Sequence, residues 1–222
     1  MKSKKICITS LNYDNYKPLS DITWRNKVEY ANRHGYSFYH HTEDKMTKDN
    51  LVLGYEKIRY ILNMLKTNKY DWIWFVGCDT LITNFNERIE SVISLAKKNE
   101  SFIVATDCNG INMDSFLVKN SPDGIMLMEE CFKSHMYFND KWCYEQRWFW
   151  ENQKIHESLI KIVPQRTFNS YLCKRLYPNQ SPIDKLNLSG EFEKGDFLIH
   201  FPGMTLRNRL KLVATFEPLI IK

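Results

Sequence analysis

The most constraining feature of this chain is an unbroken apolar run, Trp72–Val76, within the segment YDWIWFVGCDTLITN of residues 70–84. The run has no helical period, and it is bounded by polar residues on one side and by Gly77 on the other. Such a run is typical of a strand that is buried on both faces of a parallel sheet. We therefore predict an inner strand here, and an α/β fold around it.

A carboxylate, Asp79, follows this strand directly after Gly77 and Cys78. In open α/β sheets, ligands bind at the edge where the parallel strands end. A carboxylate at that edge suits a hard cation such as Mg²⁺ or Mn²⁺, which in turn holds a diphosphate. The alternative is that Asp79 and Thr80 form only a turn that starts a helix. These residues alone leave both interpretations open.

Strands and amphipathic helices alternate through the first half of the chain. Strands are predicted at residues 5–10, 36–40, 72–76 and 101–106. We predict one helix that Ser20 or Asp21 caps and Gly35 ends, a second from Leu51 to about Leu65, and a third over residues 89–96. Residues 11–18 are predicted to be a polar loop. This order predicts a mostly parallel sheet with right-handed crossovers, as in a nucleotide-binding half.

The regular alternation ends after Asp107. We predict strands at residues 115–119, 159–163 and 196–201, and helices that begin at Pro122, span residues 144–152 and span residues 205–215. No internal repeat or linker interrupts the chain. The prediction is therefore one domain over residues 1–222, with residues 1–107 as the nucleotide-binding half and residues 108–222 as the sugar and acceptor half.

Composition excludes several classes of protein. The net charge is +5, but the basic residues are scattered, which favours small anionic ligands over nucleic acid. The six cysteines, Cys173 among them, contain no C-x-x-C pair and no zinc spacing, so free thiols in a reducing compartment are expected. No apolar run is long enough for a membrane span. We expect a cytoplasmic protein, or alternatively the lumenal domain of a Golgi-type enzyme.

Six motifs in order resemble glycosyltransferase family 34, which contains galactosyl-, mannosyl- and xyloglucan xylosyltransferases. The segment WIWFVGCDTLI is similar to the family's W-I-W-W-x-D-x-D-x-x-I signature. The other five resemble N-K-x-x-Y-x-x-x-H-G-Y, W-x-K-I, F-L-I-R-N-S, D-Q and G-D-F-x-x-H-F-x-G, and they lie at residues 26–36, 57–58, 116–121, 145–146 and 195–203. The short chain also resembles small glycosyltransferases encoded by large algal viruses.

The resemblance implies a single-domain GT-A fold, a nucleoside diphosphate sugar as donor, a glycan or glycoprotein acceptor, a divalent metal and retention of the anomeric configuration. Two departures bear on the site. Gly77 stands where the family has the first aspartate of D-x-D, and Thr205 stands where it has a lysine, so the nearest cations are Arg207 and Arg209. The first change weakens the contacts to metal and ribose, and the second removes a charge that neutralises the diphosphate.

Asp79 and His200 are the predicted ligands of Mn²⁺ or Mg²⁺, because both end strands at what is expected to be one sheet edge. The alternative for His200 is an ordinary histidine at a strand end. Glu145 is predicted to lie at the reacting face of the sugar, and Gln146 to bind sugar or phosphate. The alternative for Glu145 is an acid that complements a helix dipole. Further donor contacts are carried over from the resemblance: Thr9, Ser10, Lys57, Asn120 and Gly203. The alternatives are an ordinary strand end for Thr9 and Ser10, a solvated helix lysine for Lys57 and an Asn turn for Asn120. For the basic residues after His200, Arg207 among them, closure over the diphosphate and a solvated face are both open.

The predicted function is metal-assisted transfer of a hexose or pentose from a nucleotide sugar, UDP-sugar being favoured, to a glycan hydroxyl. Loss of the leaving diphosphate needs its charge held by a metal or by Arg and Lys. Developing charge at the sugar needs a nearby carboxylate or polar group. The alternative is a sugar-nucleotide or glycan-binding protein of the same fold without turnover, which Gly77 permits. A nucleic-acid-binding module fits the charge but not the scattered basic residues.

Overall fold

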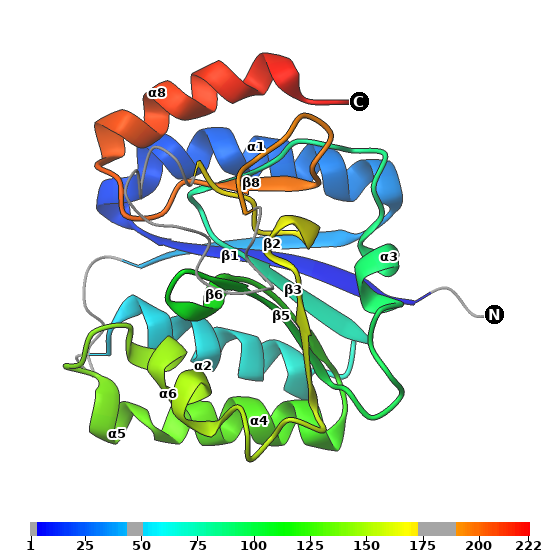
Figure 1. Ribbon diagram of the computed structural model, residues 1–222, viewed down its shortest axis with the longest axis vertical. Helices are drawn as coiled ribbons and strands as arrows, with labels where there is room; N and C mark the ends of the chain where they lie inside the picture. Colours follow the sequence, from blue (N-terminus) through cyan, green and yellow to red (C-terminus); the bar gives the residue numbers. More distant parts are fainter. Residues whose placement is uncertain (1–3, 44–50, 173–189) are drawn as a thin grey trace.

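The computed structural model describes residues 4–43, 51–172 and 190–222. Its centre is a six-stranded sheet in the order β2-β1-β3-β6-β5-β7 (Figure 1). The strands are β1 (Ile6–Tyr13), β2 (Ser37–Glu43), β3 (Trp72–Val76), β5 (Phe102–Asp107), β6 (Gly110–Lys119) and β7 (Ile160–Val163). Five of them run in one direction and β6 runs against them, because β6 pairs antiparallel with both β3 and β5. The expected mostly parallel α/β sheet is confirmed.

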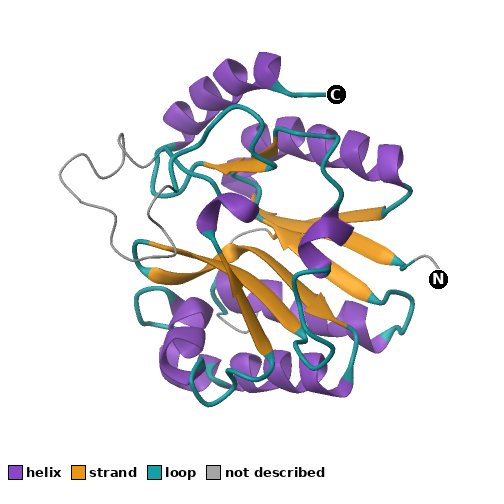
Figure 2. Ribbon diagram, turned by 45° about the vertical axis from the view of Figure 1, so that its right-hand side comes forward, coloured by secondary structure: helices purple, strands orange, loops and turns teal. Residues whose placement is uncertain are grey.

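Helices cover both faces of this sheet (Figures 1 and 2). On one face lie α1 (Lys17–His34), which packs against β1 and β2, and beside it a two-stranded antiparallel sheet of β4 (Thr80–Ile82) and β8 (Leu198–His200). Helix α8 (Leu206–Phe216) lies on the same side and packs against α1. On the other face lie α2 (Leu53–Lys66), α4 (Pro122–Lys133), α5 (His135–Phe138) and α6 (Tyr144–Asn152). The remaining short elements are α3 (Ile89–Ile93) and the 3-10 turns η1 (Asp14–Tyr16), η2 (Gln165–Thr167) and η3 (Glu217–Leu219).

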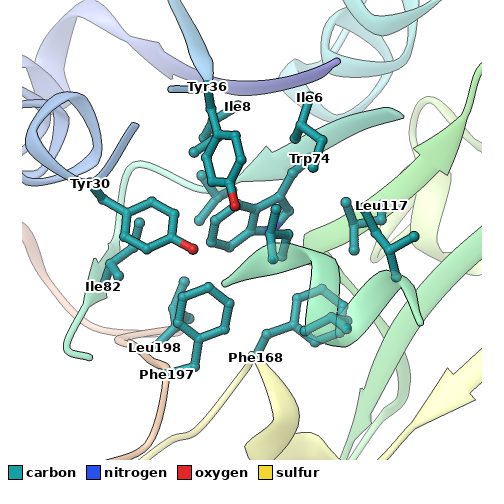
Figure 3. Close-up of a cluster of buried hydrophobic side chains, with 14 of the residues drawn as sticks. Ile6, Ile8, Tyr30, Tyr36, Trp74, Ile82, Leu117, Phe168, Phe197 and Leu198 are labelled. Carbon is teal, nitrogen blue, oxygen red and sulfur yellow. The ribbon is translucent and has the colours of Figure 1, made fainter. Parts of the chain in front are cut away.

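Strand β3 is an inner strand, as its sequence predicts, and all five of its side chains are buried. Alternate side chains of a strand point to opposite faces of the sheet. Trp72, Trp74 and Val76 accordingly join one apolar cluster and Ile73 and Phe75 join the other. Figure 3 shows the first cluster, in which Trp74 lies among residues from α1, β1 and the segment before β8. Apolar burial on both faces fixes β3, and with it the position of Asp79.

Several predicted boundaries are confirmed and others are wrong. Gly35 ends α1 with a left-handed φ of 72°, which glycine adopts without strain, and α6 spans the predicted residues 144–152. The polar loop predicted for residues 11–18 is wrong, because β1 continues to Tyr13 and α1 begins at Lys17, with Pro18 in its first turn. Neither Ser20 nor Asp21 is therefore the cap. The third helix is shorter than expected, ending at Ile93.

The turn at Asp79 leads into a strand, so the alternative in which Asp79 and Thr80 start a helix is wrong. Thr80 begins the short strand β4, which pairs with β8 so that Thr80 lies opposite His200. This pairing joins segments that are more than one hundred residues apart. It brings the chain immediately after Asp79 beside the end of β8.

Five cysteines are free thiols, and Cys173 lies outside the described residues. Among the helices that the structure describes, none combines the length and the apolar character that crossing a bilayer requires.

Candidate functional site

A cavity of about 360 Å³ opens at the edge of the main sheet where β1 and β3 end. Two helices complete its walls, α2 with Gly54 and Lys57 and α6 with Glu145 and Gln146. Both halves of the chain contribute side chains to it. Its other lining residues are Leu11, Tyr13, Tyr16, Leu53, Phe75, Gly77, Cys78, Asp79, Asp114, Cys143, Tyr144 and Arg209.

Asp79 lines this cavity and lies between Arg209 and His200. Its Oδ2 accepts from Nη2 of Arg209 at 2.8 Å, and its Oδ1 lies 3.4 Å from Nε2 of His200. Burial raises the pKa of this carboxyl, but the charges of His200 and Arg209 hold the pKa well below its ordinary value. Asp79 is therefore an anion although its side chain is only 11% exposed.

The side chain of His200 is fully buried, and one of its two ring nitrogens makes a hydrogen bond while the other makes none within the described part of the chain. Nδ1 bonds to Oδ1 of Asn169 at 3.0 Å, which fixes the orientation of the ring. Nε2 makes no hydrogen bond to any residue that the structure describes. Burial lowers the pKa of His200, but the nearby charges of Asp79 and Asp114 outweigh burial and raise the pKa above its ordinary value. An oriented imidazole with an unused buried nitrogen is the arrangement of a metal ligand.

Asp114 is a site residue that the sequence analysis missed. It lies in β6, and its Oδ2 is 3.6 Å from Nε2 of His200. A signal was available in the tight turn between β5 and β6, where Asp107 pairs with Gly110 across Cys108 and Asn109. An Asn-Gly pair between apolar runs predicts a hairpin. A hairpin reverses β6 and brings the early part of that strand to the ligand edge.

On the opposite wall, Glu145 forms a buried ion pair with Lys57, with Oε1 2.7 Å from Nζ. Nζ also donates to the carbonyl oxygen of Met113 at 2.7 Å. Burial lowers the pKa of Lys57, but the charges of Glu145 and Asp114 more than offset burial and raise it. Glu145 fits only because Gly54 has no side chain, since a Cβ built on Gly54 falls 1.8 Å from Oε2 of Glu145.

The start of α6 holds Gln146 beside Glu145. The amide oxygen of Gln146 accepts the backbone N–H of Met113 at 3.0 Å, which ties α6 to β6. Just before them, Cys143 and Tyr144 have left-handed φ values of 67° and 37°. Such values in residues other than glycine cost free energy and cluster at functional sites. This strained turn leads into α6, whose Glu145 and Gln146 side chains line the cavity.

The predicted site residues are thus only partly brought together. Asp79, His200, Lys57, Glu145 and Gln146 gather around the cavity. Thr9 and Ser10 do not line it, because β1 runs on to Tyr13 and leaves both inside the sheet.

The other three predicted contacts also lie away from the lining. Asn120 follows β6, and because β6 is reversed, Asn120 lies at the opposite sheet edge, where it donates to Leu65 and Tyr70. Gly203 belongs to the turn after β8, and Arg207 is exposed. Of the two arginines named as the nearest cations, Arg209, two residues beyond Arg207, is the one that contacts Asp79.

The donor set fits a hard divalent ion of the Mn²⁺ or Mg²⁺ type. Carboxylate oxygens with one imidazole nitrogen suit Mn²⁺ in particular. Within residues 4–43, 51–172 and 190–222, no three His, Cys, Asp or Glu side chains are already gathered at metal-binding distances. Arg209 engages Asp79 in the arrangement described. Binding of a metal by Asp79 would therefore require Arg209 to move.

Comparison with known proteins places this chain in a family. The sequence model of the galactosyl transferase GMA12/MNN10 family matches residues 2–97 and 92–211. An uncharacterized alpha-1,2-galactosyltransferase of Schizosaccharomyces pombe is 27% identical over 86% of this chain and 70% of its own length. The probable alpha-1,6-mannosyltransferase MNN10 of Saccharomyces cerevisiae is 24% identical over 69% of this chain and 48% of its own. The chain thus spans about half to 70% of the length of these relatives.

Solved structures show the same fold at low identity. A glycosyltransferase involved in glycosylation of the major capsid of PBCV-1 has a TM-score of 0.73 at 17% identity, covering 94% of this chain and 99% of its own. The galactosyltransferase LgtC, solved with donor and acceptor sugar analogs, has a TM-score of 0.55 at 10% identity over 94% and 95% of the two chains. The GT-A fold expected from the sequence is confirmed, and the chain belongs to the galactosyl transferase GMA12/MNN10 family.

Proposed function

We propose that this protein transfers a sugar from a nucleoside diphosphate sugar to a hydroxyl of a glycan or glycoprotein, with Mn²⁺ or Mg²⁺ held by Asp79 and His200. The observation that carries the proposal is the unused, buried Nε2 of His200, aimed at the carboxylate of Asp79 beside a cavity at the ligand edge of the sheet. We favour a UDP-sugar and retention of configuration, on the family resemblance. Residues 1–107 would bind the nucleotide, and residues 108–222 the sugar and acceptor.

The charge of the leaving diphosphate is the main problem that these residues address. As the bond from the anomeric carbon to the diphosphate breaks, negative charge grows on the phosphate oxygens. When bound, the divalent ion would neutralise part of that charge as a Lewis acid. Arg209 would supply a second positive charge from the floor of the cavity, where the family has a lysine four residues earlier in the chain. Fixed cations in a partly buried site act strongly because little reorganisation is needed.

Glu145 would act at the sugar itself. Positive charge grows at the anomeric carbon in an oxocarbenium-like transition state, and a carboxylate on that face stabilises it. The ion pair with Lys57 holds the carboxylate in place. Gln146, whose oxygen is engaged by Met113, would donate from its amide nitrogen to a sugar hydroxyl.

The experiment is a UDP-release assay with candidate donors, combined with thermal unfolding in the presence of UDP, GDP and their sugars, with Mn²⁺ or with EDTA. Ligands of the native state raise the unfolding temperature by mass action. We expect UDP with Mn²⁺ to stabilise more than either alone, and a UDP-sugar to release UDP in a Mn²⁺-dependent way. Stabilisation by UDP that EDTA leaves unchanged would contradict the metal assignment.

A binding protein without turnover is the second candidate, and Arg209 favours it, since its ion pair with Asp79 can take the place of a metal. Nucleotide-sugar binding without UDP release under any metal would support this second candidate.

For location, we propose the cytoplasm, because five described cysteines are free thiols. The lumenal domain of a Golgi-type enzyme is the alternative.

A further inference from the structure

We propose that Asp114 supplies the second carboxylate of the metal site, in place of the aspartate that is absent at position 77. This inference rests on the proposed function, because it assumes that Asp79 and His200 hold a divalent ion. It goes further by naming a donor from a different strand. A side chain from the neighbouring strand would thus take the place of the missing aspartate.

Strand pairing puts Asp114 directly beside Gly77. Val76 pairs with Ser115, and the N–H of Gly77 donates to the carbonyl oxygen of Asp114 at 2.7 Å. A Cβ built on Gly77 would lie 3.5 Å from the Cβ of Asp114. Side chains at positions 77 and 114 therefore start from neighbouring points at the same edge of the sheet. A carboxylate on either one can reach the same space.

The donor atoms face the unused nitrogen of His200. Oδ1 of Asp79 and Oδ2 of Asp114 lie 3.4 Å and 3.6 Å from Nε2. Atoms that share an octahedral ion at bonds of about 2.1 Å lie about 3.0 Å apart. Each of the two distances to Nε2 is therefore about half an ångström longer than a shared ion requires. A shift of this size lies within the reach of the Asp114 side chain, which is 43% exposed.

The surroundings leave Asp114 available for this role. Lys57 Nζ is 3.9 Å from its Oδ1, beyond hydrogen-bond distance, and Lys57 is already paired with Glu145 at 2.7 Å. Position 77 itself is crowded, since a Cβ there would meet Oδ1 of Asp79 at 2.9 Å. The glycine therefore gives Asp79 room while Asp114 contributes the second negative charge.

Binding of Mn²⁺ itself tests this, measured by electron paramagnetic resonance in the presence of UDP. The variants are Asp114→Asn, Asp79→Asn, and Asp123→Asn as a matched control that removes one charge from the exposed first turn of α4. We expect Asp114→Asn to weaken Mn²⁺ binding by about tenfold or more, the loss that even outer-shell partners of a metal produce. Asp123→Asn should bind as the parent does. Thermal unfolding checks that each variant is folded.

A second variant separates direct ligation from charge acting through space. Asp114→Cys, made in a Cys78→Ala background, offers a soft thiolate, which prefers Zn²⁺ to Mn²⁺. Direct ligation should shift the Zn²⁺ to Mn²⁺ affinity ratio by about tenfold or more toward Zn²⁺ relative to the Cys78→Ala parent. An unchanged ratio, or an Asp114→Asn variant with undiminished Mn²⁺ affinity, overturns the inference. If Asp79→Asn still abolishes binding in that case, the proposed function stands. If the parent binds no Mn²⁺ with UDP, both fail.

Discussion

Replacing Gly54 by alanine would place a methyl group where the carboxylate of Glu145 now lies. A Cβ at Gly54 falls 1.8 Å from Oε2, and ordinary contact begins at 3.4 Å. The carboxylate must therefore retreat by about 1.6 Å, and misplacement of a reacting group by ~1 Å costs about 10²-fold in rate. Gly54 has no left-handed φ, so alanine strains no backbone there. We expect Gly54→Ala to lower turnover by about 10²-fold, measured as UDP release under saturating donor.

Stability gives an independent test of the same clash. Because Glu145 is buried and paired with Lys57 at 2.7 Å, moving it should destabilise the protein by about 1–3 kcal/mol, the usual cost of overpacking. In a Glu145→Ala background the obstacle is gone. Alanine then favours helix α2 over glycine, by at most about 0.5–1 kcal/mol because position 54 lies in the first turn of the helix. The effect of Gly54→Ala on the free energy of unfolding should thus reverse in sign between the two backgrounds.

Urea denaturation of the four proteins in this cycle measures both effects. Equal effects of Gly54→Ala in the two backgrounds would show that the methyl group and the carboxylate do not compete. Full turnover in Gly54→Ala would refute the proposed position of Glu145 at the reacting centre.

Three further predictions concern the site and its support. Glu145→Gln should lower turnover by about 10²-fold or more while nucleotide affinity stays nearly intact, and unchanged turnover would return Glu145 to the role of a helix-dipole residue. Asp79→Ala or His200→Ala should abolish the mutual tightening of Mn²⁺ and UDP in calorimetric titrations, whereas tightening that survives would exclude both as ligands. Burial lowers the pKa of Lys27, whose Nζ donates to the carbonyl oxygen of Thr80, to about 7. Between about pH 7 and 10.5, Lys27 then carries a proton in the unfolded chain that it lacks in the folded chain. The free energy of unfolding of the parent, relative to that of Lys27→Met, should therefore rise with pH. The rise is at most about 1.4 kcal/mol per pH unit, and urea denaturation measures it. A difference that stays flat with pH would mean that Lys27 is charged in the folded state.

Local patterns were sufficient wherever the physics is local. The apolar run Trp72–Val76 fixes an inner strand, because five consecutive apolar side chains need burial on both faces. Gly35 ends α1 because its φ of 72° suits glycine. Asp79 and His200 were predicted to meet because both end strands at one sheet edge. Their atoms lie 3.4 Å apart, but His200 ends a strand of the small sheet, so the long-range pairing of β4 with β8 brings the two residues together. The boundary of β1 was wrong because Leu11 to Tyr13 are mixed in polarity and strand pairing with β2 decides their conformation.

Two decisions depended on the tertiary structure. The direction of β6 places Asp114 at the site and Asn120 at the opposite edge, and a buried strand has the same apolar pattern whether it runs parallel or antiparallel to its neighbours. Helix α8 turns Arg209 rather than Arg207 toward Asp79, which depends on how the helix packs after β8. The sequence by itself therefore determined the inner strand and the α/β fold, and it identified Asp79 and His200 as candidates without showing how they meet. Packing determined which charges surround them, because a side chain's neighbours across a sheet come from distant parts of the chain.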